Sequence, residues 1–248
     1  MSEYRALFDA RGARYNHAHR LFPGARREEG RRMLRHLRLS ADTLWLDVGA
    51  GGGFLAEAAR ESGQGGPAVG CDESAAFLTA SAVYQIRAVA EYGRLPFADG
   101  GFGASGCLAA LHHSEEPERV VGEMLRVTAP GGLVAVGDVR RGSAAAQFLN
   151  GFVDANTELG HSGRFFDVDG LAALLERAGG RGARGTAERV HWSFHRRDDA
   201  RSFCRELFGL RPATTAAGLD QALDALGLAQ WAGEWDLPWD MVFVAARA

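Results

Sequence analysis

The residues best suited to chemistry lie in the stretch LWLDVGAGGGFL, residues 44–55, where an apolar run passes into glycines. Gly49, Gly51 and Gly53 alternate with other residues, so the backbone can bend sharply and admit a ligand against bare amide groups. Asp47 sits at the edge of this bend, where its carboxylate would repel a pyrophosphate and attract a cation. The stretch therefore predicts a nucleotide-type site that prefers a positively charged ligand.

Two adjacent histidines are the candidates for acid–base chemistry. His112 and His113 follow a predicted strand, and histidine exchanges a proton near neutral pH. We expect them to act as a general base if the reacting group must lose a proton. The alternative is a structural role at the start of the helix that follows.

The positioning elements alternate between short apolar strands and helical patterns, which is typical of an α/β fold. We expect strands at 44–48, 68–71, 83–89, 102–111, 133–137, 189–194 and 241–245. We expect helices at 54–62, 74–79, 120–127, 143–159, 171–178, 200–210 and 219–228. Ligands of such sheets bind at the carboxyl ends of the strands, where the glycines lie.

Several motifs together resemble class I S-adenosylmethionine-dependent methyltransferases. The run DVGAGGG fits the pattern D-x-G-x-G-x-G, Leu95-Pro96-Phe97 matches a second motif, and a Pro-Gly-Gly turn precedes the fifth strand. The strand, paired histidines and helix in LAALHHSEEPERV are similar to the ubiquinone/menaquinone-biosynthesis type of small-molecule methyltransferase. The resemblance covers residues 4–138. It implies a doubly wound, seven-stranded, mainly parallel sheet of the Rossmann-like methyltransferase fold with a helical cap.

The resemblance also implies which residues bind S-adenosyl-L-methionine, whose product is S-adenosyl-L-homocysteine. Asp72 would bind the ribose hydroxyls, Glu91 the adenine amino group, and the backbone N–H of Tyr92 the adenine ring. Glu73 stands where an apolar residue commonly lies against adenine. The complete expected set is Asp47, Gly49, Ala50, Gly51, Gly53, Asp72, Glu73, Glu91, Tyr92, Leu108 and Tyr15. The implied activity is methyl transfer to a small-molecule acceptor such as a secondary metabolite or a quinone precursor.

Other interpretations of the glycines stay open. Gly51, Gly53 and Ala56 also fit G-x-G-x-x-G/A, and Asp72 lies about 20 residues further on, as in nicotinamide-dependent oxidoreductases. Two further alternatives are a protein that binds S-adenosylmethionine without methylating and a glycine loop without a ligand.

The chain divides into an N-terminal helical lid, residues 1–40, and a cofactor-binding domain, residues 41–248, with helical insertions at about 141–165 and 198–230. About 45 residues separate the last two expected strands, which normally form a hairpin. So long an excursion usually has a function. We expect a cap over the acceptor pocket; the alternative is an arm that forms a homodimer.

Composition excludes several classes of protein. The formal net charge of −3 gives no global attraction to nucleic acid. No apolar run approaches the roughly 20 residues of a membrane span, and the N-terminus lacks a secretory signal. Three scattered cysteines form no C-x-x-C pair, so we expect a reduced, cytoplasmic protein without a metal.

Overall fold

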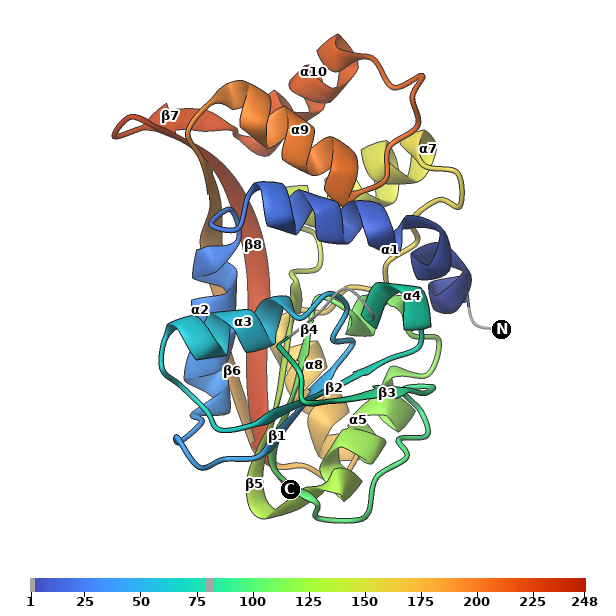
Figure 1. Cartoon of the computed structure of the whole chain (residues 1–248), viewed down its shortest axis with the longest axis vertical. Coiled ribbons are helices and arrows are strands. Elements are labelled where there is room, and N and C mark those ends of the chain that lie inside the picture. Colours follow the sequence, from blue (N-terminus) through green and yellow to red (C-terminus); the bar gives the residue numbers. More distant parts are fainter. Residues whose placement is uncertain (1–2, 79–82) are drawn as a thin grey trace.

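The computed structural model describes residues 3–78 and 83–248 and has one central sheet (Figure 1). Its strand order is β3-β2-β1-β4-β5-β8-β6, and β7 pairs with β8 outside this path. The first five strands in that order are parallel, whereas β8 is antiparallel to both β5 and β6. The bounds are β1 Trp45–Val48, β2 Ala68–Asp72, β3 Ile86–Val89, β4 Phe102–Leu108, β5 Thr128–Val139, β6 Arg181–Phe194, β7 Ala229–Trp231 and β8 Glu234–Arg247. The expected α/β fold is confirmed.

Helices cover both faces of the sheet. The helices α2 (Arg27–Leu37) and α3 (Phe54–Glu61) belong to one buried cluster, and α5 (Pro117–Val127) and α8 (Val168–Arg177) to the other. Side chains of a strand alternate between the two faces. In β8, accordingly, Met241 and Phe243 join the first cluster while Val242 and Val244 join the second.

The last two strands of the sheet form a hairpin longer than the sequence pattern suggests. β6 and β8 pair from Arg181 opposite Arg247 to Phe194 opposite Trp235. The hairpin therefore projects beyond the other strands and carries α9 (Arg197–Leu207), α10 (Ala216–Leu226) and β7 at its far end (Figure 1). These two helices occupy the insertion expected at 198–230.

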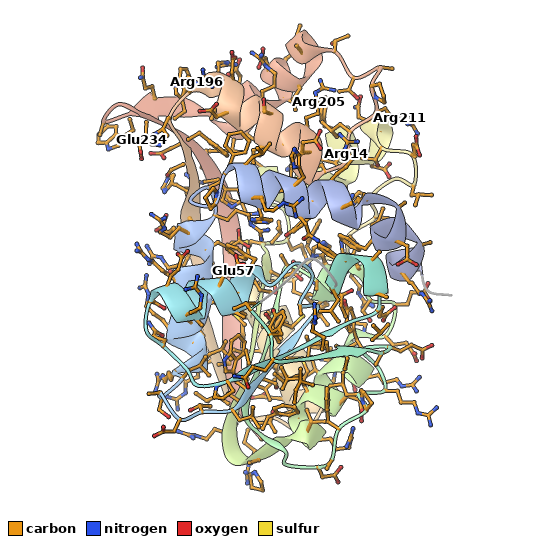
Figure 2. All side chains as sticks on the ribbon, in the orientation of Figure 1. Arg14, Glu57, Arg196, Arg205, Arg211 and Glu234 are labelled. Carbon is orange, nitrogen blue, oxygen red and sulfur yellow. The ribbon has the colours of Figure 1, made fainter. Side chains whose placement is uncertain are left out.

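The first helix, α1 (Glu3–Leu21), runs across the carboxyl ends of the strands, between α4 (Ala75–Leu78) and α9 (Figure 1). Arg14 of α1 fixes it to α9 and the loop that follows, as Figure 2 shows from its position near Arg205. Its guanidinium donates to the Glu206 carboxylate at 3.0 and 3.2 Å and to the carbonyls of Arg205 and Leu210, each at 3.2 Å. Thr79, the last residue of the expected helix at 74–79, lies outside the described residues, as do residues 1–2 of the expected lid.

β3 begins three residues later than expected, and three further elements differ more strongly from the sequence expectation. β4 ends at Leu108 because Ala109 takes a left-handed conformation, φ 53°, and the 3-10 helix η1 (Leu111–His113) follows. β5 begins five residues earlier than expected and includes the Pro-Gly-Gly turn, with a register shift against β4. The helix expected at 143–159 becomes α6 (Ala144–Phe148), the π-helix η2 (Leu149–Val153) and α7 (Asp154–Asn156). Periodicity cannot reveal these local changes, since they depend on contacts with other elements.

Candidate active site

The glycine turn joins β1 to α3 and needs its glycines for space as well as for conformation. Gly49 and Gly51 have φ of +75° and +47°, which disfavours residues with a Cβ. A Cβ on Gly49 would lie 2.4 Å from that of Ala110, and a Cβ on Gly51 would lie 2.6 Å from the Phe77 ring. Gly53, at φ +92°, is the residue before α3. The turn is therefore a tightly enclosed bend.

We expected the backbone N–H groups of this turn to be free for a ligand, and this prediction is wrong at four positions. The N–H groups of Gly49 and Ala50 donate to the carbonyl of Cys71, and that of Gly53 donates to the carbonyl of Ala50. The N–H of Gly51 donates to Asp72 Oδ2 at 2.9 Å. Three of these N–H groups are thus bonded to β2 and the fourth to the turn itself, which the sequence could not reveal. A pyrophosphate would need them, so the turn favours a ligand without phosphate.

Asp72 ends β2 and ties that strand to the turn. Its Oδ1 accepts from the Ser74 N–H at 2.9 Å, while Oδ2 accepts from Gly51. The side chain is completely buried. Each carboxylate oxygen has a second lone pair, so the expected ribose contact is compatible with these bonds once Phe77, which covers Gly51, shifts.

Asp47 carries an unusual carboxyl group. It is 2 % exposed, and the Tyr84 hydroxyl donates to Oδ2 at 2.6 Å. Burial is the main reason that the pKa of Asp47 rises to about 7; the Tyr84 hydrogen bond lowers it and the negative charge of Asp72 raises it. A buried carboxylate of this kind is stabilised by a cationic ligand.

A small cavity of about 40 Å³ lies between this turn and α1. Phe8, Tyr15 and Arg26 close it from the N-terminal side. Asn16 lies directly over Gly52, where its Oδ1 would be 2.0 Å from a Cβ on that glycine. The same oxygen is buried without a hydrogen-bond partner among the described residues, while the Asn16 amide donates to the Phe77 carbonyl.

These observations fit S-adenosylmethionine. Its ammonium and sulfonium are cationic, and the cavity lining includes the Asp47 carboxylate, while the Asn16 oxygen without a partner lies beside the lining residue Gly52. The cavity is smaller than such a ligand, so Phe77 and α1 must move for it to enter. No sequence motif predicts that Asn16 lies at this site, because its position depends on how α1 crosses the turn.

The structure gathers part of the expected cofactor set. Asp47, Gly49, Ala50, Gly51, Leu108 and Tyr15 line this cavity. The other expected residues lie outside its lining. Glu73 accepts a hydrogen bond from the Tyr92 N–H at 3.2 Å, so that N–H already has a partner, and the Tyr92 side chain is buried. Glu91 is exposed.

A second cavity of about 50 Å³ adjoins the first. The two share Phe8, Tyr15, Arg26 and Ala109 as lining residues. The remaining lining comes from seven elements and the loops beside them. It consists of Arg11, His112, His113, Val139, Leu149, His161, Trp192, Leu207, Phe208 and Trp239. Tyr15 and Trp192 are among the aromatic residues of this lining, while Phe152, Phe165, Phe166 and Phe194 lie outside it.

His112 is the most firmly held of the histidines in this cavity. Its Nδ1 lies 2.6 Å from Asp138 Oδ1, and its backbone N–H donates to Oδ2 at 3.0 Å. Asp138 is completely buried at the carboxyl end of β5. His113 and His161 stack near it, with ring centroids 4.1 and 5.5 Å from that of His112. No sequence signal pointed to Asp138, because this residue belongs to no local motif, and the sequence marked His161 only as a weaker candidate for the base than His112 and His113.

The pKa values of the two neighbouring histidines are low. Burial, followed by the neighbours His112, His161 and Arg11, holds the pKa of His113 well below its usual range. Burial, followed by His112 and Arg11, lowers the pKa of His161 to about 2. Both rings are therefore neutral at physiological pH and are weak bases.

Comparison with known proteins agrees with this geometry. Residues 46–136 match the methyltransferase domain family, whereas no curated protein sequence matches the chain. Among solved structures, an S-adenosylmethionine-dependent methyltransferase from Thermotoga maritima has a TM-score of 0.63 at 16% identity, covering 98% of this chain and 99% of that one.

Two further structures share the fold. Phosphoethanolamine N-methyltransferase 2 from Haemonchus contortus, in complex with S-adenosylhomocysteine, has a TM-score of 0.66 at 15% identity and covers 98% of this chain and 59% of that one. The [4+2]-cyclase SpnF has a TM-score of 0.58 at 18% identity, with 89% and 81% covered. At these identities the likeness shows the fold alone.

Among residues 3–78 and 83–248, no helix combines the length and the apolar character needed to cross a bilayer. The strand order, the enclosed glycine turn with its buried carboxylate and the domain match agree with one another. Residues 46–136 thus form a methyltransferase domain, within a chain that has the fold of S-adenosylmethionine-dependent methyltransferases.

Proposed function

We propose that this enzyme methylates a small molecule, such as a secondary metabolite or a quinone precursor, bound in the cavity beside His112. The supporting observation is that this cavity adjoins the one at the glycine turn and shares four lining residues with it. A donor in the first cavity and an acceptor in the second would meet between Tyr15 and Ala109.

The cofactor would be held by the expected set of residues. Asp47 and the glycine turn would face its charged end, and Asp72 its ribose. Glu73, Glu91 and the Tyr92 N–H would reach adenine only after the Glu73–Tyr92 hydrogen bond is broken. When bound, S-adenosylmethionine supplies a methyl group on a positively charged sulfur.

The chain's own contribution is alignment and exclusion of water. Holding two reactants in the correct orientation can lower the activation free energy, by on the order of 7–11 kcal/mol in model reactions. Phe8 and Tyr15 of α1, together with Leu207 and Phe208 at the end of α9 within the insertion, line the acceptor cavity. This supports the cap interpretation of residues 1–40 and 198–230 over a homodimer arm. Of the two expected histidines, His112 is proposed to take a proton from the acceptor, because burial holds the pKa of His113 well below its usual range.

Calorimetric titration with S-adenosylhomocysteine and with NADH tests the cofactor assignment. We expect micromolar binding of the thioether and none of the dinucleotide; the reverse result would refute it. A screen with methyl-labelled donor against phenolic, quinone-type and amine acceptors then tests methyl transfer. Binding without turnover of any acceptor would support a protein that uses the cofactor without methylating.

The three buried thiols, which form no disulfide, support a reducing, cytoplasmic location.

A further inference from the structure

We propose that the acceptor is a planar conjugated ring carrying an acidic hydroxyl, a phenol or an enol, and that His112 removes its proton while Asp138 positions His112. This inference rests on the proposed function and assigns the substrate class and the atom that is methylated.

Flat aromatic surfaces dominate one side of the acceptor cavity. Trp192 and Trp239 stack with ring centroids 4.1 Å apart and an interplanar angle of 23°. Phe208 lies at 23° to Trp239, with centroids 6.2 Å apart. Nearly parallel rings favour a planar guest, because stacking adds about 0.5–1.5 kcal/mol per ring pair beyond burial. The aromatic wall therefore selects a flat acceptor over a flexible aliphatic one.

The charge of the cavity discriminates between a hydroxyl and an amine. Its described lining contains two guanidinium groups, Arg11 and Arg26, and no carboxylate. Arg26 is neutralised by its ion pair with buried Glu29. Arg11 is 9 % exposed, donates to the Phe208 carbonyl at 3.3 Å and lies over the Phe8 ring.

The positive charge of Arg11 acts inside the cavity, where it contributes to lowering the pKa of His113 and of His161, and it favours an anionic acceptor. An aliphatic amine, with a pKa of about 10, is cationic at neutral pH and would be repelled. A phenolic hydroxyl, also with a pKa of about 10, becomes negative as it loses its proton, and Arg11 would stabilise that charge.

His112 has the geometry of a base. Asp138 accepts from its backbone N–H and from Nδ1, and also from the Val139 N–H at 2.7 Å. With Nδ1–H donated to this carboxylate, the Nε2 atom keeps its lone pair. The other groups around the ring are His113 and His161, both held neutral by burial, and the positive Arg11. The Asp138 carboxylate offsets the positive charge of Arg11 when His112 takes a proton.

The reaction balances without a further reagent. The acceptor hydroxyl transfers its proton to Nε2 of His112, and the oxygen keeps the electron pair of the O–H bond. That oxygen then forms a bond to the methyl carbon as the carbon–sulfur bond breaks, and the electron pair of this bond stays on sulfur. His112 afterwards releases its proton to water.

The test uses three coumarins with the same planar ring: 7-hydroxycoumarin, 7-(aminomethyl)coumarin, whose alkyl amine is cationic at neutral pH, and 7-methoxycoumarin. Wild-type enzyme with labelled donor should methylate the hydroxyl compound and leave the amine and the methoxy compound unchanged. Methylation of the amine in preference to the hydroxyl would overturn the inference. Failure to methylate 7-hydroxycoumarin or any other hydroxylated planar ring would overturn it too. Unimpaired binding of S-adenosylhomocysteine would show that the cofactor assignment survives.

The key variant is His112→Asn. The asparagine amide can donate to Asp138 from the place of Nδ1, so the fold is kept while Nε2 is removed. Turnover of 7-hydroxycoumarin should fall about 100-fold or more at neutral pH. The deficit should shrink when the pH exceeds the pKa of the acceptor hydroxyl, because the acceptor is then ionised in solution. An equal deficit at every pH would mean a merely structural role and would overturn the inference.

Asp138→Asn tests the positioning residue. An asparagine can donate to Nδ1 and so favours the wrong tautomer. It should lower turnover with the same pH dependence and remove the downfield Nδ1–H proton resonance of His112. His195→Gln is the control, since this side chain is 89 % exposed and should change neither readout.

A metal ion is the rival use of the three histidines. One ring nitrogen from each of His112, His113 and His161 lies within 4.8 Å of the others. Titration of the wild-type protein with Co²⁺ decides between the two roles. No visible absorption band is expected up to millimolar Co²⁺. A tight, saturable band that His161→Ala abolishes would identify metal ligands and overturn the role of His112 as a base.

Discussion

Asp47→Asn is expected to stabilise the ligand-free protein and to weaken cofactor binding. Burial raises the pKa of Asp47 from 3.8 to about 7. Because the native state binds this proton more tightly than the unfolded chain, stability falls as the pH rises through that interval. One pKa unit is worth about 1.4 kcal/mol, so the ionised carboxylate costs the fold about 4 kcal/mol. Asparagine is neutral and its amide oxygen can still accept from the Tyr84 hydroxyl.

Urea unfolding at two pH values measures this effect. The variant should gain about 4 kcal/mol over wild type at pH 8 and only about 1.5 kcal/mol at pH 5, where native Asp47 is already protonated. Asp42→Asn, a change at an exposed aspartate before β1, should have no such effect. A stability gain of equal size at both pH values would refute the raised pKa of Asp47.

Calorimetry with S-adenosylhomocysteine measures the second effect. Loss of one partner of a buried charge pair costs at least about 2 kcal/mol, or roughly a 30-fold rise in Kd at pH 8. The difference between variant and wild type should diminish at pH 6, where wild-type Asp47 is mostly neutral. An unchanged Kd at pH 8 would show that Asp47 does not face the cofactor's ammonium.

Three further predictions concern neighbouring elements. The pKa of His161 is lowered to about 2, so the free energy of unfolding should fall as the pH drops below about 6.5. His161→Gln should remove about 2 kcal/mol of this loss at pH 5, as measured by urea unfolding. Gly49→Ala should lower the melting temperature far more than Gly63→Ala, because both glycines have positive φ but only Gly49 would meet another side chain; equal losses would refute the steric argument. Arg14→Ala should cost under about 1 kcal/mol and speed S-adenosylhomocysteine association in stopped flow, since it loosens α1; an unchanged rate would mean that α1 does not control entry.

The sequence alone determined the sheet and the cofactor turn. Alternating strands and helices, together with the run DVGAGGG, are local signals, because strand burial and glycine conformation depend on residues close together in the chain. Asp47 and Asp72 were placed correctly at the ends of β1 and β2 for the same reason.

Only the tertiary structure decided what surrounds the acceptor. Asp138 and His161 meet His112 from β5 and from the loop before α8, and Trp239 meets Trp192 across the long hairpin. Asn16 covers the glycine turn because α1 crosses it. Backbone N–H groups of the turn that were expected to be free donate hydrogen bonds to β2 instead. Such contacts join residues far apart in the chain, and their energies depend on burial, which no local pattern encodes.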